Sequence, residues 1–314
     1  MEKLLIFGTG FISDSLIEYV QSNYKKTKII IIYNFHKITG NAGENIIQYS
    51  INDDVKKILL FEKPTHIVCL KGMSFVSSNI DPVTSINNNV LVTLNFLENI
   101  FLSGYMEKLK KVLIIGSASE YGKFYSEPIQ ENYQLHPTSL YGLGKIFLYN
   151  SALFYKDRGM PIVYVRQFNT VGPNQRDQFA LPAFAKQIAK IEKGVQEKTI
   201  SVGDLTQERD FLDVRDTVAA YILLLEKGVI GEVYNVASGR CISMQNVLNL
   251  FIMNTSMAIS DIKMVENKEL FSEKNSLSKR LWGDVTKIRS LGFKPIYKLE
   301  ETILDILNYW RLNV

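Results

Sequence analysis

The segment LLIFGTGFIS, residues 4–13, decides the fold class of this chain. A short apolar run, Leu4 to Phe7, leads directly into Gly8-Thr-Gly10, and a helical pattern follows. In a dinucleotide-binding unit the first glycine makes a tight turn, the second lets a pyrophosphate approach the backbone, and a small residue such as Ser13 allows close packing of helix on strand. The same glycine pattern also occurs in turns that bind nothing, so the flanking strand and helix carry the assignment.

The apolar pattern extends this unit into a sheet. Strand-like runs alternate with amphipathic helical stretches, which predicts parallel strands joined by crossover helices. We expect strands over 4–7, 29–33, 46–51, 66–70, 112–115 and 162–165, and a helix over 90–102. Beyond residue 168 the regularity is lost, with a helix over 181–193, a strand over 199–202 and a closing helix over 299–311. The predicted fold class is α/β: a doubly wound parallel Rossmann sheet with a smaller C-terminal α/β substrate lobe.

Composition excludes several other classes of protein. The chain has 314 residues, of which 46% are hydrophobic and 22% charged, which is ordinary globular composition. No apolar run approaches the roughly 18 residues of a membrane span, and residues 4–7 are too few for a signal-peptide core, so we expect a cytoplasmic protein without membrane contact. Two cysteines and three scattered histidines predict no metal site, and the net charge of +4 is too dispersed to predict nucleic-acid binding.

The end of the second strand bears on the choice of cofactor. NAD-binding folds usually place an Asp or Glu there, about 20 residues beyond the glycine turn, to hold the ribose. Here the strand ends Tyr33-Asn34-Phe35-His36-Lys37, without a carboxylate. A missing acid near a lysine favours a 2′-phosphate, so NADP(H) is predicted over NAD(H), with Asn34, His36 and Lys37 as candidate contacts. The alternative is that these are ordinary surface residues of a loop.

Ser117, Tyr141 and Lys145 are the candidate catalytic residues. Tyr141 and Lys145 are four positions apart, so they share one face of a helix. An ammonium close to a phenol favours the phenolate, and we expect it to lower the pKa of Tyr141 toward neutrality. Ser117 follows the strand 112–115 and can hydrogen-bond the same reacting oxygen. The tyrosine and lysine alone are a weak signal, but the glycine turn and Ser117 in this order make it specific.

Together these motifs resemble the extended, nucleotide-sugar-modifying branch of the short-chain dehydrogenase/reductase family. The resemblance covers nearly the whole chain through NVLVTLNFLE (89–98), RQFNTVGPNQ (166–175), VGDL (202–205), RDFLDVRD (209–216), VYNVASG (233–239) and LGFKP (291–295). The FAKQI stretch (184–188) and the 209–216 block are most similar to GDP-6-deoxy-4-keto-mannose reductases and the neighbouring GDP-mannose 4,6-dehydratases.

The resemblance implies domains and site residues. Residues 1–168 would form the NADP-binding Rossmann domain, with 213–238 returning to it, and residues 169–212 and 239–314 the nucleotide-sugar-binding lobe. Tyr141 would donate the proton, Lys145 would hold the nicotinamide ribose, and Ser117 would support the substrate oxygen. The implied cofactor contacts are Gly8, Gly10, Phe11, Ile12, Asn34, His36, Lys37, Ser50, Ile51, Leu70, Lys71, Gly72, Asn89, Tyr141 and Lys145. The implied substrate contacts are Ser74, Ser119, Asn169, Lys186, Arg209 and Lys274.

Some of these contacts have alternatives. Asn169 is alternatively a structural turn residue, and Arg209 alternatively an ion-pair partner of Asp213 or Asp216. The branch usually grips the diphosphate with an Arg-Pro-Ser-Glu-type stretch, whereas residues 270–275 read LFSEKN. Lys274, Lys279 or Arg280 would have to replace that arginine, and a lysine offers a point charge instead of a fork. GDP, dTDP and CDP therefore all stay open as the nucleotide.

Departures from the family pattern bear on the reaction. A 4,6-dehydratase of the branch places a further acid and base two and three residues before the tyrosine of the strand-end motif. Here those positions are Ser119 and Ala118, and strand alternation is expected to turn Glu120 to the opposite side. A 4-epimerase of the branch carries an acid where this chain has Tyr33.

We therefore expect NADPH-dependent reduction of the C4 keto group of an NDP-6-deoxy-4-keto-hexose, GDP or dTDP linked, to an NDP-6-deoxyhexose. By family analogy such products feed surface polysaccharides such as lipopolysaccharide O-antigen. An epimerase or dehydratase of the same fold is the main alternative, followed by a non-catalytic or an RNA-binding relative. Relatives pair through their middle helices, so a homodimer with a four-helix interface is expected.

Overall fold

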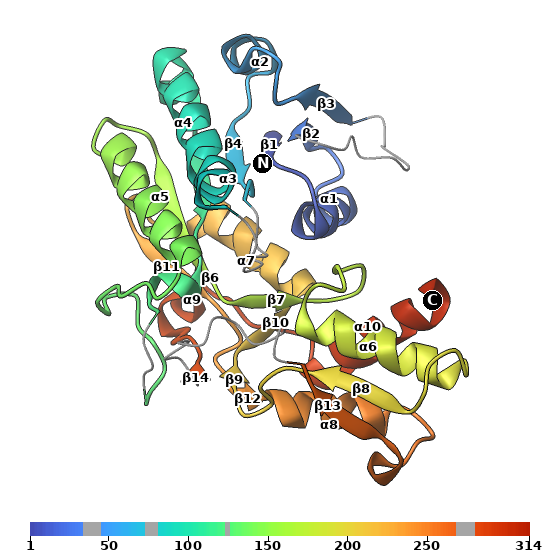
Figure 1. Ribbon diagram of the computed structural model, residues 1–314. Coiled ribbons are helices and arrows are strands. Elements are labelled where there is room, and N and C mark those ends of the chain that lie inside the picture. Colours follow the sequence, from blue (N-terminus) through green and yellow to red (C-terminus); the bar gives the residue numbers. More distant parts are fainter. Residues whose placement is uncertain (34–44, 73–80, 123–125, 268–279) are drawn as a thin grey trace.

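A seven-stranded parallel sheet forms the centre of the computed structural model, which describes residues 1–33, 45–72, 81–122, 126–267 and 280–314 (Figure 1). The strand order is β11-β6-β5-β4-β1-β2-β3. The strands are β1 (Lys3–Phe7), β2 (Lys28–Tyr33), β3 (Ile46–Ser50), β4 (His66–Cys69), β5 (Lys111–Ile115), β6 (Ile162–Gln167) and β11 (Val233–Val236). The predicted α/β class with a doubly wound parallel sheet is confirmed. The limits of the six strands expected in it differ from the observed ones by at most two residues, whereas the edge strand β11 was not among those expected.

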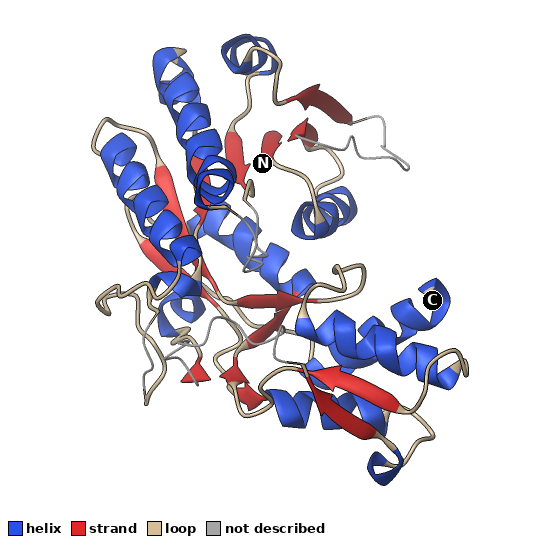
Figure 2. Cartoon of the chain, viewed as in Figure 1, coloured by secondary structure: helices blue, strands red, loops and turns tan. Residues whose placement is uncertain are grey.

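Helices cover both faces of this sheet, as Figure 2 shows. On one face lie α1 (Phe11–Asn23) and α7 (Val214–Lys227), and on the other α2 (Val55–Glu62), α4 (Val92–Leu102) and α5 (Leu140–Lys156). Because successive side chains of a strand point to opposite faces, Leu4 and Ile6 enter the first core while Leu5 and Phe7 enter the second. Burial on both faces explains why the inner strands, such as β2 with Ile29 to Ile32, are apolar almost without interruption.

The helix expected over 90–102 begins earlier and is not uniform. The chain forms α3 (Pro82–Ile86), a π-helical turn (Asn87–Leu91) and α4 in continuous succession. Asp81 caps this run, since its carboxylate accepts the N–H groups of Val83 and Thr84. The π turn inserts an extra residue, which shifts the apolar positions and hides the beginning of the helix in the sequence pattern.

The remaining elements form a smaller lobe with its own core. Its helices are α6 (Ala180–Glu192), α8 (Met244–Met253) and α10 (Leu299–Asn313), packed on the parallel pair β8 (Thr199–Val202) and β13 (Lys263–Glu266). Between lobe and sheet lie β7 (Asn169–Val171), β10 (Phe211–Asp213), β9 (Glu208–Arg209), β12 (Ile242–Ser243), β14 (Arg280–Leu281) and α9 (Thr286–Ser290). The short 3-10 turns are Tyr105–Lys108, Ala118–Glu120 and Ile259–Asp261. The division into two domains stays a prediction.

Two buried carboxylates tie the lobe to the carboxyl edge of the sheet. Asp210 accepts the N–H and the hydroxyl of Ser238 at 2.8 and 2.7 Å, and the N–H of Gly239 at 2.9 Å, just after β11. Asp213 ends β10, caps α7 and accepts the hydroxyl of Thr302 in α10 at 2.7 Å. None of the helices in the described ranges combines the length and apolarity that crossing a bilayer requires.

Candidate active site

The carboxyl ends of β1, β4 and β5 meet at one edge of the sheet, where the glycine turn lies. Gly8 has φ +107°, and a Cβ atom there would lie 2.8 Å from the backbone nitrogen of Lys71. Its own N–H donates to the carbonyl of Ile32 at 2.9 Å. Only glycine combines this backbone conformation with so close an approach. The turn after β1 is therefore packed directly on the turn after β4.

The beginning of α1 has the geometry of a phosphate site. Gly10 has φ +148°, and no atom lies within 4 Å of the position its Cβ would take. Ser13 fixes the turn through hydrogen bonds of 2.7 Å to the N–H and the carbonyl of Gly10. Phe11 and Ile12 form the first turn of α1, and the Phe11 ring lies 3.3 Å from the Cβ position of Gly172. Open space in front of a helix N-terminus fits a pyrophosphate.

The adenosine end of the candidate site is described only in part. Ser50 and Ile51 lie at the end of β3, and Asp53 closes that turn by accepting the Ser50 N–H at 2.6 Å. Asp53 was not predicted from the sequence. An acidic residue three positions after Ser50, where it can accept the Ser50 N–H, was the available signal. The expected 2′-phosphate contacts Asn34, His36 and Lys37 lie outside the described residues.

The structure brings Ser117, Tyr141 and Lys145 together. Ser117 caps the 3-10 turn Ala118–Glu120 after β5, and Tyr141 lies in the first turn of α5 and makes a hydrogen bond with Ser117. A Cβ on Gly142 would lie 2.4 Å from the carbonyl oxygen of Ser119, so the beginning of α5 is pressed against the 3-10 turn. The Nζ atom of Lys145 lies 5.8 Å from the centre of the Tyr141 ring.

The ammonium of Lys145 points toward the turn after β4. It donates to the carbonyl of Ile115 at 2.9 Å, and the Cβ position of Gly72 lies 3.4 Å from Lys145 Nζ and 3.3 Å from Asn89 Oδ1. Asn89 belongs to the π-helical turn and donates its amide to the carbonyl of Ser85 at 3.0 Å. Of the other expected contacts here, Leu70 is half-buried and Lys71 is buried. These groups surround the place that the resemblance gives to the nicotinamide ribose.

The pKa of Tyr141 moves in the direction opposite to our expectation. Desolvation in the site raises the pKa of its hydroxyl to about 12, and the charge of Glu120 adds to this, while the hydrogen bond with Ser117 opposes it. The expectation considered only Lys145, whose own pKa is lowered to about 8 by burial, with Glu120 opposing. At neutral pH both side chains therefore hold their protons, which suits Tyr141 as an acid.

Glu120 does not lie on a strand, so the expected strand alternation is wrong there. The chain turns into a 3-10 helix after Ser117, and the Glu120 side chain returns to accept the Ser117 N–H at 2.8 Å. It is fully buried and pairs with Arg166, whose Nε lies 2.9 Å away. The sequence reasoning missed this pair, although Arg166 opens the RQFNTVGPNQ motif.

The candidate substrate residues fall into separate groups. Ser119 lies beside Ser117. Asn169 donates to the carbonyl of Asp210 at 2.9 Å, and Asp210 directly follows Arg209 of β9. Arg209 donates to Gln207 Oε1 at 2.7 Å. Lys186 of α6 forms an ion pair with Asp177, which precedes that helix, at 2.6 Å. The two carboxylates considered as alternative partners of Arg209 are both engaged elsewhere. Asp213 pairs with Arg215, and Asp216 accepts the backbone N–H groups of residues 296 and 297. Ser74 and Lys274 lie outside the described residues.

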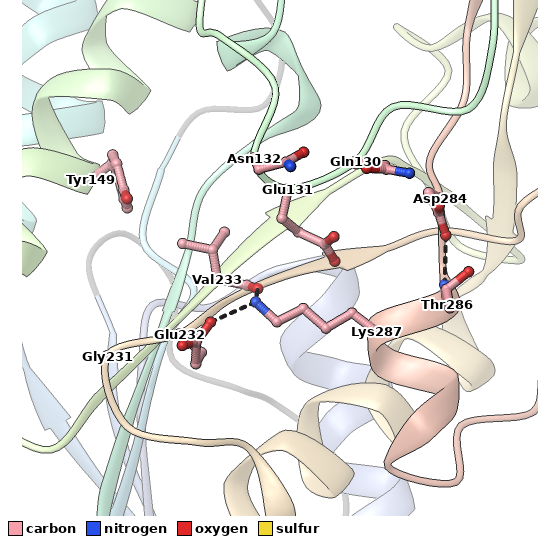
Figure 3. A pocket seen from close by; sticks show the side chains of 10 residues that line it. All are labelled: Gln130, Glu131, Asn132, Tyr149, Gly231, Glu232, Val233, Asp284, Thr286 and Lys287. Atoms are coloured by element: carbon pink, nitrogen blue, oxygen red, sulfur yellow. Dashed lines mark hydrogen bonds and ion pairs between the residues drawn. The ribbon is translucent and has the colours of Figure 1, made fainter.

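The cavity in Figure 3, about 670 Å³ in volume, is a different place. It is lined by Tyr149 of α5, by residues 231–233 at the amino end of β11, by residues 130–132, and by Asp284, Thr286 and Lys287. Lys287 crosses it and donates to Glu232 and to the carbonyl of Val233, both at 2.7 Å. Catalytic candidates lie at the carboxyl ends of the strands, so this cavity is not the candidate active site. Within the described ranges, no three His, Cys, Asp or Glu residues are grouped to hold a metal ion.

Comparisons with known proteins show which family this chain is similar to. Residues 5–306 match the GDP-mannose 4,6-dehydratase family. GDP-6-deoxy-D-mannose reductase of Pseudomonas aeruginosa is 30% identical over 258 residues, covering 81% of this chain and 82% of that protein. GDP-6-deoxy-D-talose 4-dehydrogenase of Aggregatibacter actinomycetemcomitans is 27% identical, covering 92% and 90%. The structure of RMD from Pseudomonas aeruginosa complexed with NADPH superimposes with a TM-score of 0.81 at 26% identity, covering all of both chains. A UDP-glucuronic acid 4-epimerase of Bacillus cereus with bound NAD has the same fold, with a TM-score of 0.85 at 23% identity over 99% of this chain and all of that one.

We predict that Gly8→Ala weakens dinucleotide binding at least tenfold. The new Cβ would collide with the Lys71 backbone in addition to straining a positive φ, so the turns after β1 and β4 must separate. Gly194→Ala is the matched control, because Gly194 also has a positive φ (+71°) but no atom lies within 4 Å of its Cβ position. Fluorescence titration with NADPH should show at least a tenfold weaker affinity for Gly8→Ala alone. Equal affinities in the two variants would refute the role given to this turn.

Proposed function

This chain belongs to the GDP-mannose 4,6-dehydratase family of nucleotide-sugar-modifying short-chain dehydrogenases/reductases, and we propose that it is a reductase acting on the C4 keto group of an NDP-6-deoxy-4-keto-hexose. The resemblance found in the sequence is thereby confirmed at the level of the family. The observation that supports the proposal best is the grouping of Ser117, a protonated Tyr141 and Lys145 beside Gly72 and Asn89.

Each of these side chains has a defined part in the proposed reaction. Bound NADPH would supply the hydride that reduces the C4 carbon. Tyr141 would donate its hydroxyl proton to the C4 oxygen, so the carbonyl becomes a hydroxyl, and Tyr141 would recover a proton from solvent. Ser117 would donate a hydrogen bond to the same oxygen, where negative charge develops. Lys145 and Asn89 would hold the ribose next to the nicotinamide.

The residues around Ser117 favour reduction over dehydration. Removing water from C5 and C6 requires a second acid and base near the sugar. The 3-10 turn provides Ala118 and Ser119, and the carboxylate of Glu120 is buried and paired with Arg166 instead. Reduction needs only the proton that Tyr141 holds.

Two relatives guide the choice of substrate and cofactor. Both are named for GDP-linked 6-deoxyhexoses, so we propose GDP as the first nucleotide to test, with dTDP second. NADPH is the proposed cofactor because it occupies the structure of RMD, whereas the Bacillus cereus epimerase holds NAD. The product would be an NDP-6-deoxyhexose for surface polysaccharide synthesis in the cytoplasm.

A homodimer with a four-helix interface is part of the proposal. α4 and α5 lie side by side on one face of the sheet (Figure 1). Both helices carry large apolar side chains that are about half exposed: Leu91, beside the beginning of α4, and Leu102, Leu143, Phe147 and Phe154. Exposed apolar side chains gathered on adjacent helices mark an interaction surface.

We predict that the purified protein oxidises NADPH when it is offered a GDP-6-deoxy-4-keto-hexose made in place by its dehydratase. The assay follows the loss of NADPH absorbance against GDP-, dTDP- and CDP-linked 4-keto sugars, with NADH in parallel. Oxidation with none of them would refute the reductase assignment and favour an epimerase or dehydratase acting on an unreduced NDP-sugar.

Replacing Tyr141 by phenylalanine is predicted to lower kcat by about 10²- to 10⁴-fold, because the proton donor is lost. The KM for NADPH should change little, since the ring remains. Tyr24→Phe is the control: its hydroxyl donates to Glu226 at 2.8 Å on the other face of the sheet, so its kcat should equal that of the wild type. Full turnover by Tyr141→Phe would contradict the mechanism.

NADPH affinity is predicted to fall as the pH rises through about 8. Burial lowers the pKa of Lys145 to about that value, so the free protein loses the ammonium that would hold the ribose. In Lys145→Arg the group stays charged, and the fall near pH 8 should disappear even if binding is weaker throughout. Dissociation constants measured from pH 6 to 10 check this. A fall of the same size and midpoint in both proteins would contradict it.

A further inference from the structure

We propose that Glu120 is a positioning residue that holds Ser117 and Lys145 in their reactive arrangement, through one hydrogen bond to the Ser117 backbone and another to Tyr164, which also contacts the Lys145 backbone. This inference rests on the proposed function, because it assigns a role within the same site. It concerns a carboxylate that the reaction itself does not use.

The first link runs from Glu120 to Ser117. Oε1 of Glu120 accepts the backbone N–H of Ser117 at 2.8 Å, and the Ser117 hydroxyl oxygen accepts the N–H of Ser119 at 3.1 Å. The two bonds close a capping box around the 3-10 turn. The direction in which the Ser117 hydroxyl faces Tyr141 therefore depends on the Glu120 carboxylate.

The second link runs from Glu120 to Lys145. The hydroxyl of Tyr164 in β6 lies 3.0 Å from Glu120 Oε1 and 3.1 Å from the carbonyl oxygen of Lys145, and its hydrogen is shared between these acceptors. Lys145 Nζ in turn donates to the carbonyl of Ile115, two residues before Ser117. The turn after β5 and the helix α5 are thus joined at two points.

Arg166 balances the charge of Glu120 without entering the site. Its Nε donates to Glu120 Oε2 at 2.9 Å, and its Nη1 donates to the hydroxyl of Tyr121 at 3.2 Å and to the carbonyl of Glu131 at 2.8 Å. Both members of the pair are buried. Such a pair is weak as a source of stability, since apolar residues of similar volume often replace buried ion pairs without loss. Its value here lies in fixing geometry.

The charge of Glu120 also reaches the two titrating groups of the site. Lys145 is faced by Glu120 from the 3-10 turn, by Cys69 from β4, by Asn89 from the π-helical turn, and by Tyr141 from its own helix. Glu120 itself is faced by Arg166 and Tyr164 from β6 and by Ser117. Glu120 holds the pKa of Lys145 higher than burial alone would leave it.

The test is a double-mutant cycle between Ser117→Ala and Glu120→Gln. Glutamine keeps an oxygen for the Ser117 N–H but turns an amide against Arg166, so the carboxylate position is lost. We expect Glu120→Gln to lower kcat by about 10- to 100-fold in the wild-type background and by a clearly smaller factor in the Ser117→Ala background, because the part of its effect that acts through Ser117 is then absent while the part that acts through Lys145 remains.

A second readout does not depend on turnover. Without the charge of Glu120, the pH at which NADPH affinity falls should move below the wild-type midpoint. The shift can be measured by fluorescence titration even if the sugar substrate differs from the one proposed. Failure of the proposed function would show as no turnover of any 4-keto sugar by the wild type, whereas failure of this inference shows in the comparison of variants.

Glu62→Gln is the matched control. Glu62 is also a buried glutamate that accepts a tyrosine hydroxyl, from Tyr49 at 2.6 Å, and pairs with a cation, Lys28 at 3.0 Å, but it ends α2 at the opposite edge of the sheet. It should lose stability without moving the pH midpoint. If Glu120→Gln does not fold, Tyr164→Phe keeps the ion pair, removes the bridge to Lys145 and should still lower kcat. The inference would be overturned if Glu120→Gln lowered kcat by the same factor in the wild type and in Ser117→Ala, or if it left the pH midpoint of NADPH affinity unchanged. A wild-type kcat in Tyr164→Phe would also overturn it.

Discussion

The site depends on a single buried carboxylate being satisfied. Glu120 is fully buried, so each oxygen must find donors within the protein, and it finds them in the Ser117 N–H, the Tyr164 hydroxyl and Arg166. An unpaired charge at this depth would cost several kcal/mol. Four segments of chain are therefore held in one relation: the end of β5, the 3-10 turn, β6 and the beginning of α5. Tyr141 takes its place from this arrangement.

A second constraint, the close packing of turns at the carboxyl edge, complements the first. Gly8 brings the turn after β1 against the turn after β4, and Gly142 brings α5 against the 3-10 turn. Parallel strands present all their carboxyl ends at one edge, so these contacts bring the glycine turn and Tyr141 to the same edge of the sheet. The lobe adds Arg209 and Asn169 at the same edge, linked through Asp210. The candidate cofactor residues and the candidate substrate residues thus share one edge of the sheet.

The sequence predicted the sheet well because its strands are continuous apolar runs, and it predicted the glycine turn because turn geometry is local. It could not predict features that arise from packing. The π-helical turn around Asn89 breaks the helical period, and strand alternation was extended past Gly116 although the strand had ended. The predicted direction of the Tyr141 pKa shift was wrong. Spacing along a helix reveals the nearby Lys145, but it reveals neither the desolvation of Tyr141 nor the charge of Glu120. Asp53 and Arg166 could be assigned roles only once the structure showed their partners, the Ser50 N–H and the Glu120 carboxylate.

The central claim is that C4 of the sugar receives a hydride from NADPH while Tyr141 donates the proton. The most direct measurement uses NADPH carrying deuterium at C4 of the nicotinamide and identifies the sugar product by NMR. The account predicts one deuterium bound to C4 of the hexose, for each NADPH consumed, and a hydroxyl on the same carbon. An unlabelled product, or a C4 epimer formed without net consumption of NADPH, would contradict it.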